Sequence, residues 1–115
     1  MKARPLRKLM QKNRVFLHLL YSDTKKNTTH RLNLCTNVQA KLVLHILHDI
    51  INGVIPLKAG DAKALKKTKR IKILQRIESK DNLRDYLGFA REDKVSFLKQ
   101  FTALYPLLFR SIFEE

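Results

Sequence analysis

A long apolar stretch in the middle of the chain constrains the fold more than any other feature of the sequence. It begins at Thr36, which is followed three residues later by Gln39, and this pair at this spacing forms a capping box at a helix start. It ends at Gly53, a residue type that readily adopts the left-handed conformation found after the last turn of a helix. We therefore predict a helix over residues 36–52. Its wide apolar face consists of Val38, Leu42, Val43, Leu44, Ile46, Leu47, Ile50 and Ile51.

Such a helix must be covered by other elements, and the rest of the sequence also favours helices over strands. The 115 residues include only three glycines and three prolines, and no run alternates between apolar and polar residues as a strand would. We expect an all-α fold, a single compact bundle of about five to six short helices that forms one domain over residues 1–115. The apolar link 54–57 should turn the chain back against the core, because Pro56 pushes Ile55 out of helical geometry.

Spacing and capping signals predict the other helices. A basic amphipathic helix is expected over residues 4–21, with Asn13 as its point of weakness. The polar turn formers of residues 22–33 indicate a connection with at most a short turn of helix. Asp61 is a suitable N-cap for a basic helix over residues 61–77, and Ser79 for a short helix over residues 79–87 that Gly88 ends. Aromatic helices are expected over residues 91–113, with a kink or a new short helix at Pro106.

Positive charge is concentrated in two parts of the chain, whose formal net charge is +14. Residues 2–31 carry nine basic side chains against one acid, and residues 58–80 carry nine against two. Like charges this close repel one another, and a polyanionic partner would relieve the repulsion. The distribution predicts binding to nucleic acid through its phosphates, largely independent of base sequence and steeply dependent on salt.

Two groups of basic residues are expected to make these phosphate contacts. The first is Lys58, Lys63, Lys66, Lys67, Lys69, Arg70, Lys72 and Arg76, and the second is Arg4, Arg7, Lys8, Lys12 and Arg14. The first group contains no aromatic residue, which favours phosphate or groove contact over a single-strand stacking platform, and we expect DNA in preference to RNA. Residues 66–70 also fit a nuclear-import signal, which predicts a nuclear protein. The single cysteine favours an intracellular location and is also compatible with a virion interior. The Arg- and Lys-rich opening before Asp23 is also typical of a mitochondrial presequence, the alternative location.

Apolar and aromatic residues recur at spacings of three and four from Phe97 to Ile112. Part of this stripe should pack on the helix over residues 36–52, with Phe101 buried at its centre. Residues after Pro106 are expected to contribute less to folding and more to a protein partner or to self-association. The predicted contact residues are Leu107, Leu108, Phe109, Ile112 and Phe113.

Other kinds of chemistry have weaker sequence support. Neither a glycine-rich phosphate loop nor a nucleophile elbow is present, so we expect no enzyme, no cofactor and no small-molecule substrate. His45, His48 and Asp49 share one turn of a helix but lack a partnering motif, so we expect no metal site there. The single cysteine, Cys35, cannot form an internal disulfide. No apolar run is long enough to span a membrane.

The order of features from Leu34 to Leu87 resembles that of small basic proteins encoded by Polinton (Maverick) transposons and related virus-like elements. The matching features are the apolar helix 40–51, the link 52–57, the lysine-rich block 63–72, Ile73-Leu74 and a serine-led helix at Ser79. The resemblance covers about half of the chain. It implies a DNA-condensing, virion-associated or transposon-associated role.

Three hypotheses follow from the sequence. The first is a small helical protein that binds nucleic acid, most of all DNA. The second is a structural or adaptor module that docks on another protein through its aromatic C-terminal helix. The third is an organellar ribosomal protein, which would prefer ribosomal RNA.

Overall fold

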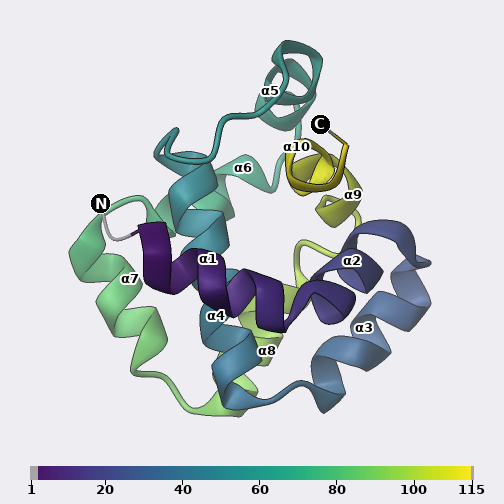
Figure 1. The fold of residues 1–115 in the computed structure, drawn as a ribbon. Coiled ribbons are helices and arrows are strands. Elements are labelled where there is room, and N and C mark those ends of the chain that lie inside the picture. Colours follow the sequence, from purple (N-terminus) through teal and green to yellow (C-terminus); the bar gives the residue numbers. More distant parts are fainter. Residues whose placement is uncertain (1–2, 115) are drawn as a thin grey trace.

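The protein is all-α, as the sequence predicts (Figure 1). The computed structural model describes the backbone of residues 3–114 and the side chains of residues 6–114. Within that range there is no strand, and the chain forms ten α-helices and one short 3-10 helix. The helices are α1 (Ala3–Lys12), α2 (Arg14–Ser22), α3 (Lys25–Leu34), α4 (Asn37–Ile51), α5 (Ala59–Lys66), α6 (Ile71–Leu74), η1 (Gln75–Ile77), α7 (Lys80–Leu87), α8 (Arg91–Lys99), α9 (Tyr105–Leu108) and α10 (Arg110–Phe113).

The central helix α4 forms as the sequence predicts. Its capping box is complete: the Gln39 amide donates to Thr36 Oγ1 at 3.1 Å, and the Thr36 amide donates to Gln39 Oε1 at 3.0 Å. Gly53 follows the helix with a φ of 76°, the left-handed conformation that a side chain would oppose. Val38 is the exception on the predicted apolar face, because it is exposed.

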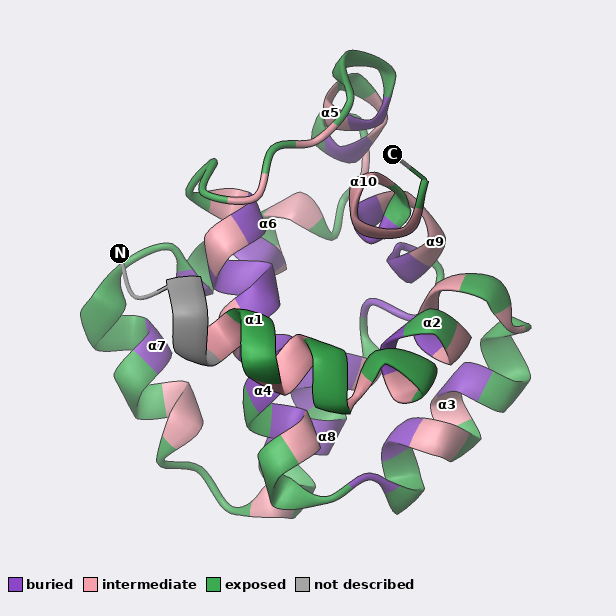
Figure 2. Ribbon diagram, in the orientation of Figure 1, coloured by how far each residue is buried: buried purple, intermediate pink, exposed green. Residues whose placement is uncertain are grey.

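Helix α4 lies at the centre of the bundle, and α8, α7 and α1 pack against it (Figure 2). Leu42, Val43, Leu44, Ile46 and Leu47 of α4 are fully buried. A radius of gyration of 13.0 Å is what a compact globule of about this length has. The predicted packing of the aromatic stripe on this helix is confirmed, since α8 is its main neighbour and Phe101 is fully buried.

The predicted helix over residues 4–21 divides at Asn13 into α1 and α2. The side chain of Asn13 donates to the Leu9 carbonyl at 2.9 Å and accepts from Gln39 Nε2. The bond to Leu9 competes with the hydrogen bonds of the helical backbone. The break at the predicted point is therefore confirmed. The link at Ile55 and Leu57 packs partly against the core, as predicted.

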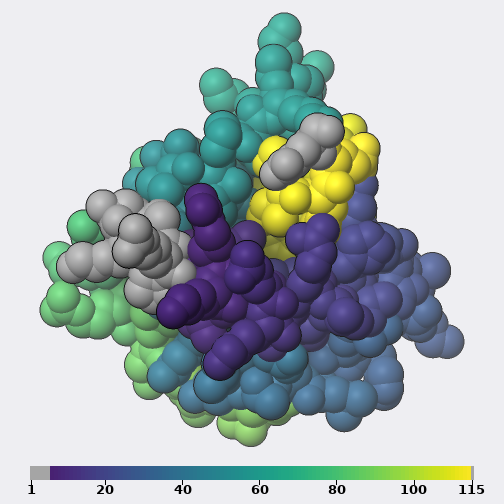
Figure 3. Space-filling view, in the orientation of Figure 1, coloured from purple at the N-terminus to yellow at the C-terminus, as the bar shows by residue number. Residues whose placement is uncertain are grey.

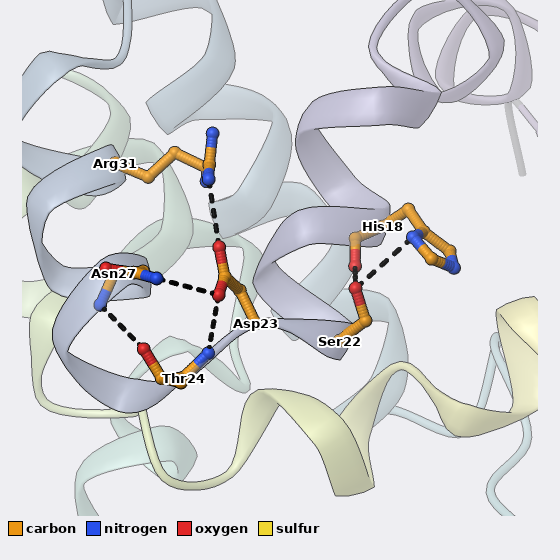
Figure 4. A network of polar contacts seen from close by, with 6 residues as sticks. All are labelled: His18, Ser22, Asp23, Thr24, Asn27 and Arg31. Atoms are coloured by element: carbon orange, nitrogen blue, oxygen red, sulfur yellow. Dashed lines mark hydrogen bonds and ion pairs between the residues drawn. The ribbon is translucent and has the colours of Figure 1, made fainter.

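Residues 22–33 were expected to form a connection with at most a short turn of helix, and this prediction underestimated the helix, because residues 25–34 form the 10-residue helix α3. Thr24 caps this helix by accepting from the Asn27 amide at 3.2 Å. Asp23 accepts from the Thr24 amide, the Asn27 side chain and Arg31 (Figure 4). The hydrogen bond from Asn27, then those from Thr24 and Arg31, lower the pKa of Asp23. These local bonds start a helix in a sequence with hardly any apolar periodicity.

The prediction of one continuous helix over residues 61–77 was also wrong. Helix α5 begins at Ala59 with Lys58 as its N-cap and ends at Lys66, and the chain then turns before α6 and η1. Thr68 bonds its hydroxyl to the Leu65 carbonyl at 2.8 Å, which competes with the helical backbone pattern. Repulsion among the neighbouring lysines also opposes a continuous helix here. Asp61 is not a cap but a buried residue in the first turn of α5.

The aromatic C-terminal region breaks earlier than predicted. Helix α8 ends at Lys99, residues 100–104 form turns, and Pro106 occupies the first turn of the short helix α9, where its missing donor costs little. By contrast, Ser79 caps α7 as predicted, accepting from the Asn82 amide at 3.0 Å, and α7 ends before Gly88.

Candidate nucleic-acid interface

The first basic surface lies on α1 and the start of α2. Leu6, Leu9 and Met10 turn one side of α1 toward the core, and the predicted basic residues lie among them on other sides. Those basic residues are all exposed: Arg7, Lys8, Lys12 and Arg14. We call these four the N-terminal basic surface. Arg4, predicted to belong with them, lies in the first turn of α1, and its side chain falls outside the described part of the chain.

The second basic surface follows α5, the turn after it, and α6. Leu65 and Leu74 anchor this segment in the core, while every predicted basic residue is exposed. The residues are Lys58, Lys63, Lys66, Lys67, Lys69, Arg70, Lys72 and Arg76, and we call them the second basic surface. Lys63 and Lys66 lie in the last turn of α5, where positive charge interacts favourably with the helix dipole.

No residue of either basic surface forms an ion pair with an acid within the described residues. The ion pairs found there involve Arg31, His48, Arg91 and Arg110, none of which belongs to either surface. Asp61, the acid within the second basic segment, pairs with Arg110 at 3.2 Å. The exposed acids of α8 lie on a helix at the opposite end of the molecule from α5 (Figure 1). The residues of both surfaces therefore form no ion pair in the described structure, although Glu78 lies two positions from Arg76 and Asp49 lines the same groove as Arg7 and Arg14.

Other basic residues have a structural role instead. Arg91 donates from Nε to the Cys35 carbonyl at 2.7 Å, and Lys99 donates to Asn33 Oδ1 at 2.9 Å. Lys94, which is only 1% exposed, donates to Asn37 Oδ1. These side chains of α8 hold the turn between α3 and α4. The basic residues of α8 thus have a structural role, unlike the exposed residues of the two basic surfaces.

A groove separates α1 from the C-terminal segment, next to the link that leads into α5. Its volume is about 460 Å³. Arg7 and Arg14 line it from the N-terminal basic surface, and Ile55 and Pro56 line it just before Lys58. In Figure 3 the N-terminal helix (purple), the segment that includes α5 (teal) and the C-terminal segment (yellow) meet on this face.

Polar groups are also found in this groove. Asp49, on α4, lines it with a largely buried side chain, and its Oδ1 lies 3.5 Å from His48 Nδ1. Ser111, on α10, lines it too, and its Oγ is buried without a hydrogen-bond partner in the described structure. Arg14 lies over the ring of Phe113, 5.3 Å from its centroid. The groove thus combines apolar walls with a carboxyl group, a hydroxyl group and two guanidinium groups.

The structure contradicts part of the predicted partner-binding surface. Leu108 and Phe109 are fully buried in the core, so they are not available to a partner in this fold. Leu107, Ile112 and Phe113 are half-buried and pack against that core. The reason is that the turns over residues 100–104 fold the stripe back on α2 and α5 instead of extending it into solvent.

The remaining candidate residues have ordinary environments. In residues 3–114 no cluster of three or more His, Cys, Asp and Glu residues is placed to hold a metal ion. Cys35 is a free, buried thiol whose pKa is raised by burial. None of the helices in this part of the chain combines the length and apolar character that a membrane crossing requires.

Sequence reasoning missed the groove and the burial of Lys94. The groove is built from segments around residues 7–14, 49–56 and 111–113, and no local pattern links them. Comparison with models of known protein families, with curated proteins and with solved structures finds no match.

Proposed function

We propose that the protein binds nucleic acid, and DNA in particular, through its two basic surfaces. The observation that carries the proposal is that every described residue predicted to contact phosphates is exposed and makes no ion pair within the described structure. Each phosphate that such a residue neutralises releases counterions, which drives binding without reading the base sequence. The role is one of binding and not of catalysis.

DNA is preferred over RNA because of the resemblance of residues 34–87 to basic proteins of DNA transposons. The alternative, an adaptor that docks through its C-terminal helix, loses support because Leu108 and Phe109 are core residues. The ribosomal alternative predicts tighter binding to structured RNA than to DNA, so a parallel titration with an RNA duplex separates it from the proposal.

The test is a fluorescence anisotropy titration of a labelled DNA duplex with matched variants. Lys66→Gln/Lys67→Gln removes two charges from the second basic surface, and Lys25→Gln/Lys26→Gln removes the same charge from exposed residues of α3. The first variant should weaken binding and flatten its salt dependence, with a log–log slope lowered by about 1 for each lost phosphate contact. The second should bind nearly as the unmodified chain does. Equal losses in both variants would show that net charge alone attracts DNA and would contradict a defined interface.

A further inference from the structure

We propose that the groove between α1 and the C-terminal segment takes one unpaired nucleotide of the bound nucleic acid. This inference rests on the proposed function, since the two basic surfaces would hold the strand on either side. Arg7 and Arg14 belong both to the groove and to the N-terminal basic surface. On the other side, the link through Ile55 and Pro56 leads directly to Lys58 of the second basic surface.

The size of the groove fits a ligand of this kind. Its volume of about 460 Å³ lies within the range of roughly 300 to 1,000 Å³ that is typical of sites for small organic ligands. Apolar walls formed by Met10, Ile55 and Ile112 would cover the faces of a planar base. A base that leaves a stack needs such a surface to offset the cost of unstacking.

The polar groups of the groove fit the edge and the phosphate of a nucleotide. The Asp49 carboxyl group can accept hydrogen bonds from the amino or imino groups of a base. The Ser111 hydroxyl is buried without a partner, which is costly, and a rotation of this side chain toward the groove would let it bond to a base edge. Arg7 and Arg14 are exposed at the groove and can bind the phosphate.

An acidic, apolar peptide is the competing occupant, and the groove favours the nucleotide over it. The two arginines would attract either ligand. Asp49 decides between them, because its carboxyl group, largely buried inside the groove, can accept hydrogen bonds from a base, whereas an apolar side chain placed there would leave it without a partner.

The test compares two labelled DNA duplexes that differ only in one unpaired nucleotide at the centre. The unmodified chain should bind the duplex with the unpaired nucleotide about tenfold more tightly, as expected if the apolar walls bury part of one base. A third duplex with a ribonucleotide at the unpaired position shows whether the sugar matters, and a preference for either sugar supports the inference. A photoreactive thio-substituted base at that position should crosslink to the peptide that contains Met10 or the one that contains Ile112.

Two variants fill the groove from opposite walls, and one control adds the same side chain elsewhere. Ile55→Trp and Met10→Trp should remove the preference for the unpaired nucleotide and leave binding to the fully paired duplex unchanged. Val15→Trp changes a residue that is 74% exposed and does not line the groove, so the preference should persist. Two groove variants are used so that misfolding of one does not decide the result.

The inference is overturned if both duplexes bind equally well, or if the preference survives in both groove variants. It is also overturned if an acidic, apolar peptide, and not the unpaired nucleotide, raises the melting temperature of the unmodified chain and fails to do so in Ile55→Trp. In each of these cases binding to the paired duplex still supports the proposed function. If neither duplex binds at low salt, the proposed function itself fails.

Discussion

At the scale of single residues, Lys94 is a basic side chain buried in the fold, where its positive charge is unfavourable. It is 1% exposed, and its amine donates to Asn37 Oδ1 with no carboxyl partner in the described structure. Burial, and secondly the charge of Lys41, lower its pKa below the ordinary value of 10.5. The folded state therefore releases the proton more easily than the unfolded chain does.

We predict that Lys94→Met raises the free energy of unfolding by about 1 to 2 kcal/mol at pH 7, because it removes the cost of burying a charge. The unmodified chain should gain stability as the pH rises from the lowered pKa of Lys94 toward 10.5, where the unfolded state still binds the extra proton. The advantage of the variant should therefore shrink over that range. Urea denaturation across this pH range measures it, with Lys26→Met, a change of an exposed lysine that does not act on the pKa of Lys94, as control. A variant that is less stable at every pH would contradict this reasoning.

The residue scale also shows where local chemistry suffices for prediction. The bonds between Thr36 and Gln39, and between Ser79 and Asn82, join residues three positions apart, so the sequence alone reveals them. The role of Lys94 is set by a contact with Asn37, 57 positions away. A lysine in an amphipathic segment gives no sign of being buried.

At the scale of elements, α9 belongs to the core, and α10, which has no fully buried residue, packs against it. Phe109 is fully buried and its ring lies 5.3 Å from that of Tyr105. The hydroxyl of Tyr105 donates to the Leu98 carbonyl at 2.7 Å, and Arg110 pairs with Asp61 of α5. These contacts join α8, α9, α10 and α5.

We predict that Phe109→Ala lowers the free energy of unfolding by about 3 to 5 kcal/mol, the usual cost of removing a core phenylalanine. Phe89→Ala, which truncates a residue that is 43% exposed, should cost less than about 1 kcal/mol. Chemical denaturation measures both variants, and sedimentation reports their oligomeric state. If Phe109→Ala folds with unchanged stability but converts a dimer to a monomer, the segment is an interface after all.

The elements that could not be predicted share one cause. Residues 61–77 have a helical pattern, yet the Thr68 hydroxyl bond and the surrounding lysines end α5 at Lys66. Residues 25–34 have little pattern, yet the Asp23 and Thr24 bonds begin a helix there. In both places the hydrogen bonds of a few polar side chains decide where the helix begins or ends. The spacing of apolar residues does not reveal these bonds, so it could not predict the helix boundaries.

At the scale of the whole molecule, the role of a basic residue depends on the helix that carries it. The basic residues of α8 hold the turn between α3 and α4, and those of the two basic surfaces are exposed. The sequence predicts both basic groups, because charge runs are visible in it, but not the groove between α1 and the C-terminal segment. Residues 7, 49 and 111 become neighbours of one groove only when the chain folds.

The most direct test of the central claim is the salt dependence of DNA binding by the intact chain. The observed association constant for a short duplex is measured by anisotropy between about 50 and 200 mM monovalent salt, a range in which several phosphate contacts change affinity by orders of magnitude. If the two basic surfaces bind phosphates together, the log–log slope should be about −4 or steeper, which corresponds to roughly five contacts or more. No binding at the lowest salt, or a slope shallower than about −1, would contradict the claim that these surfaces form a nucleic-acid interface.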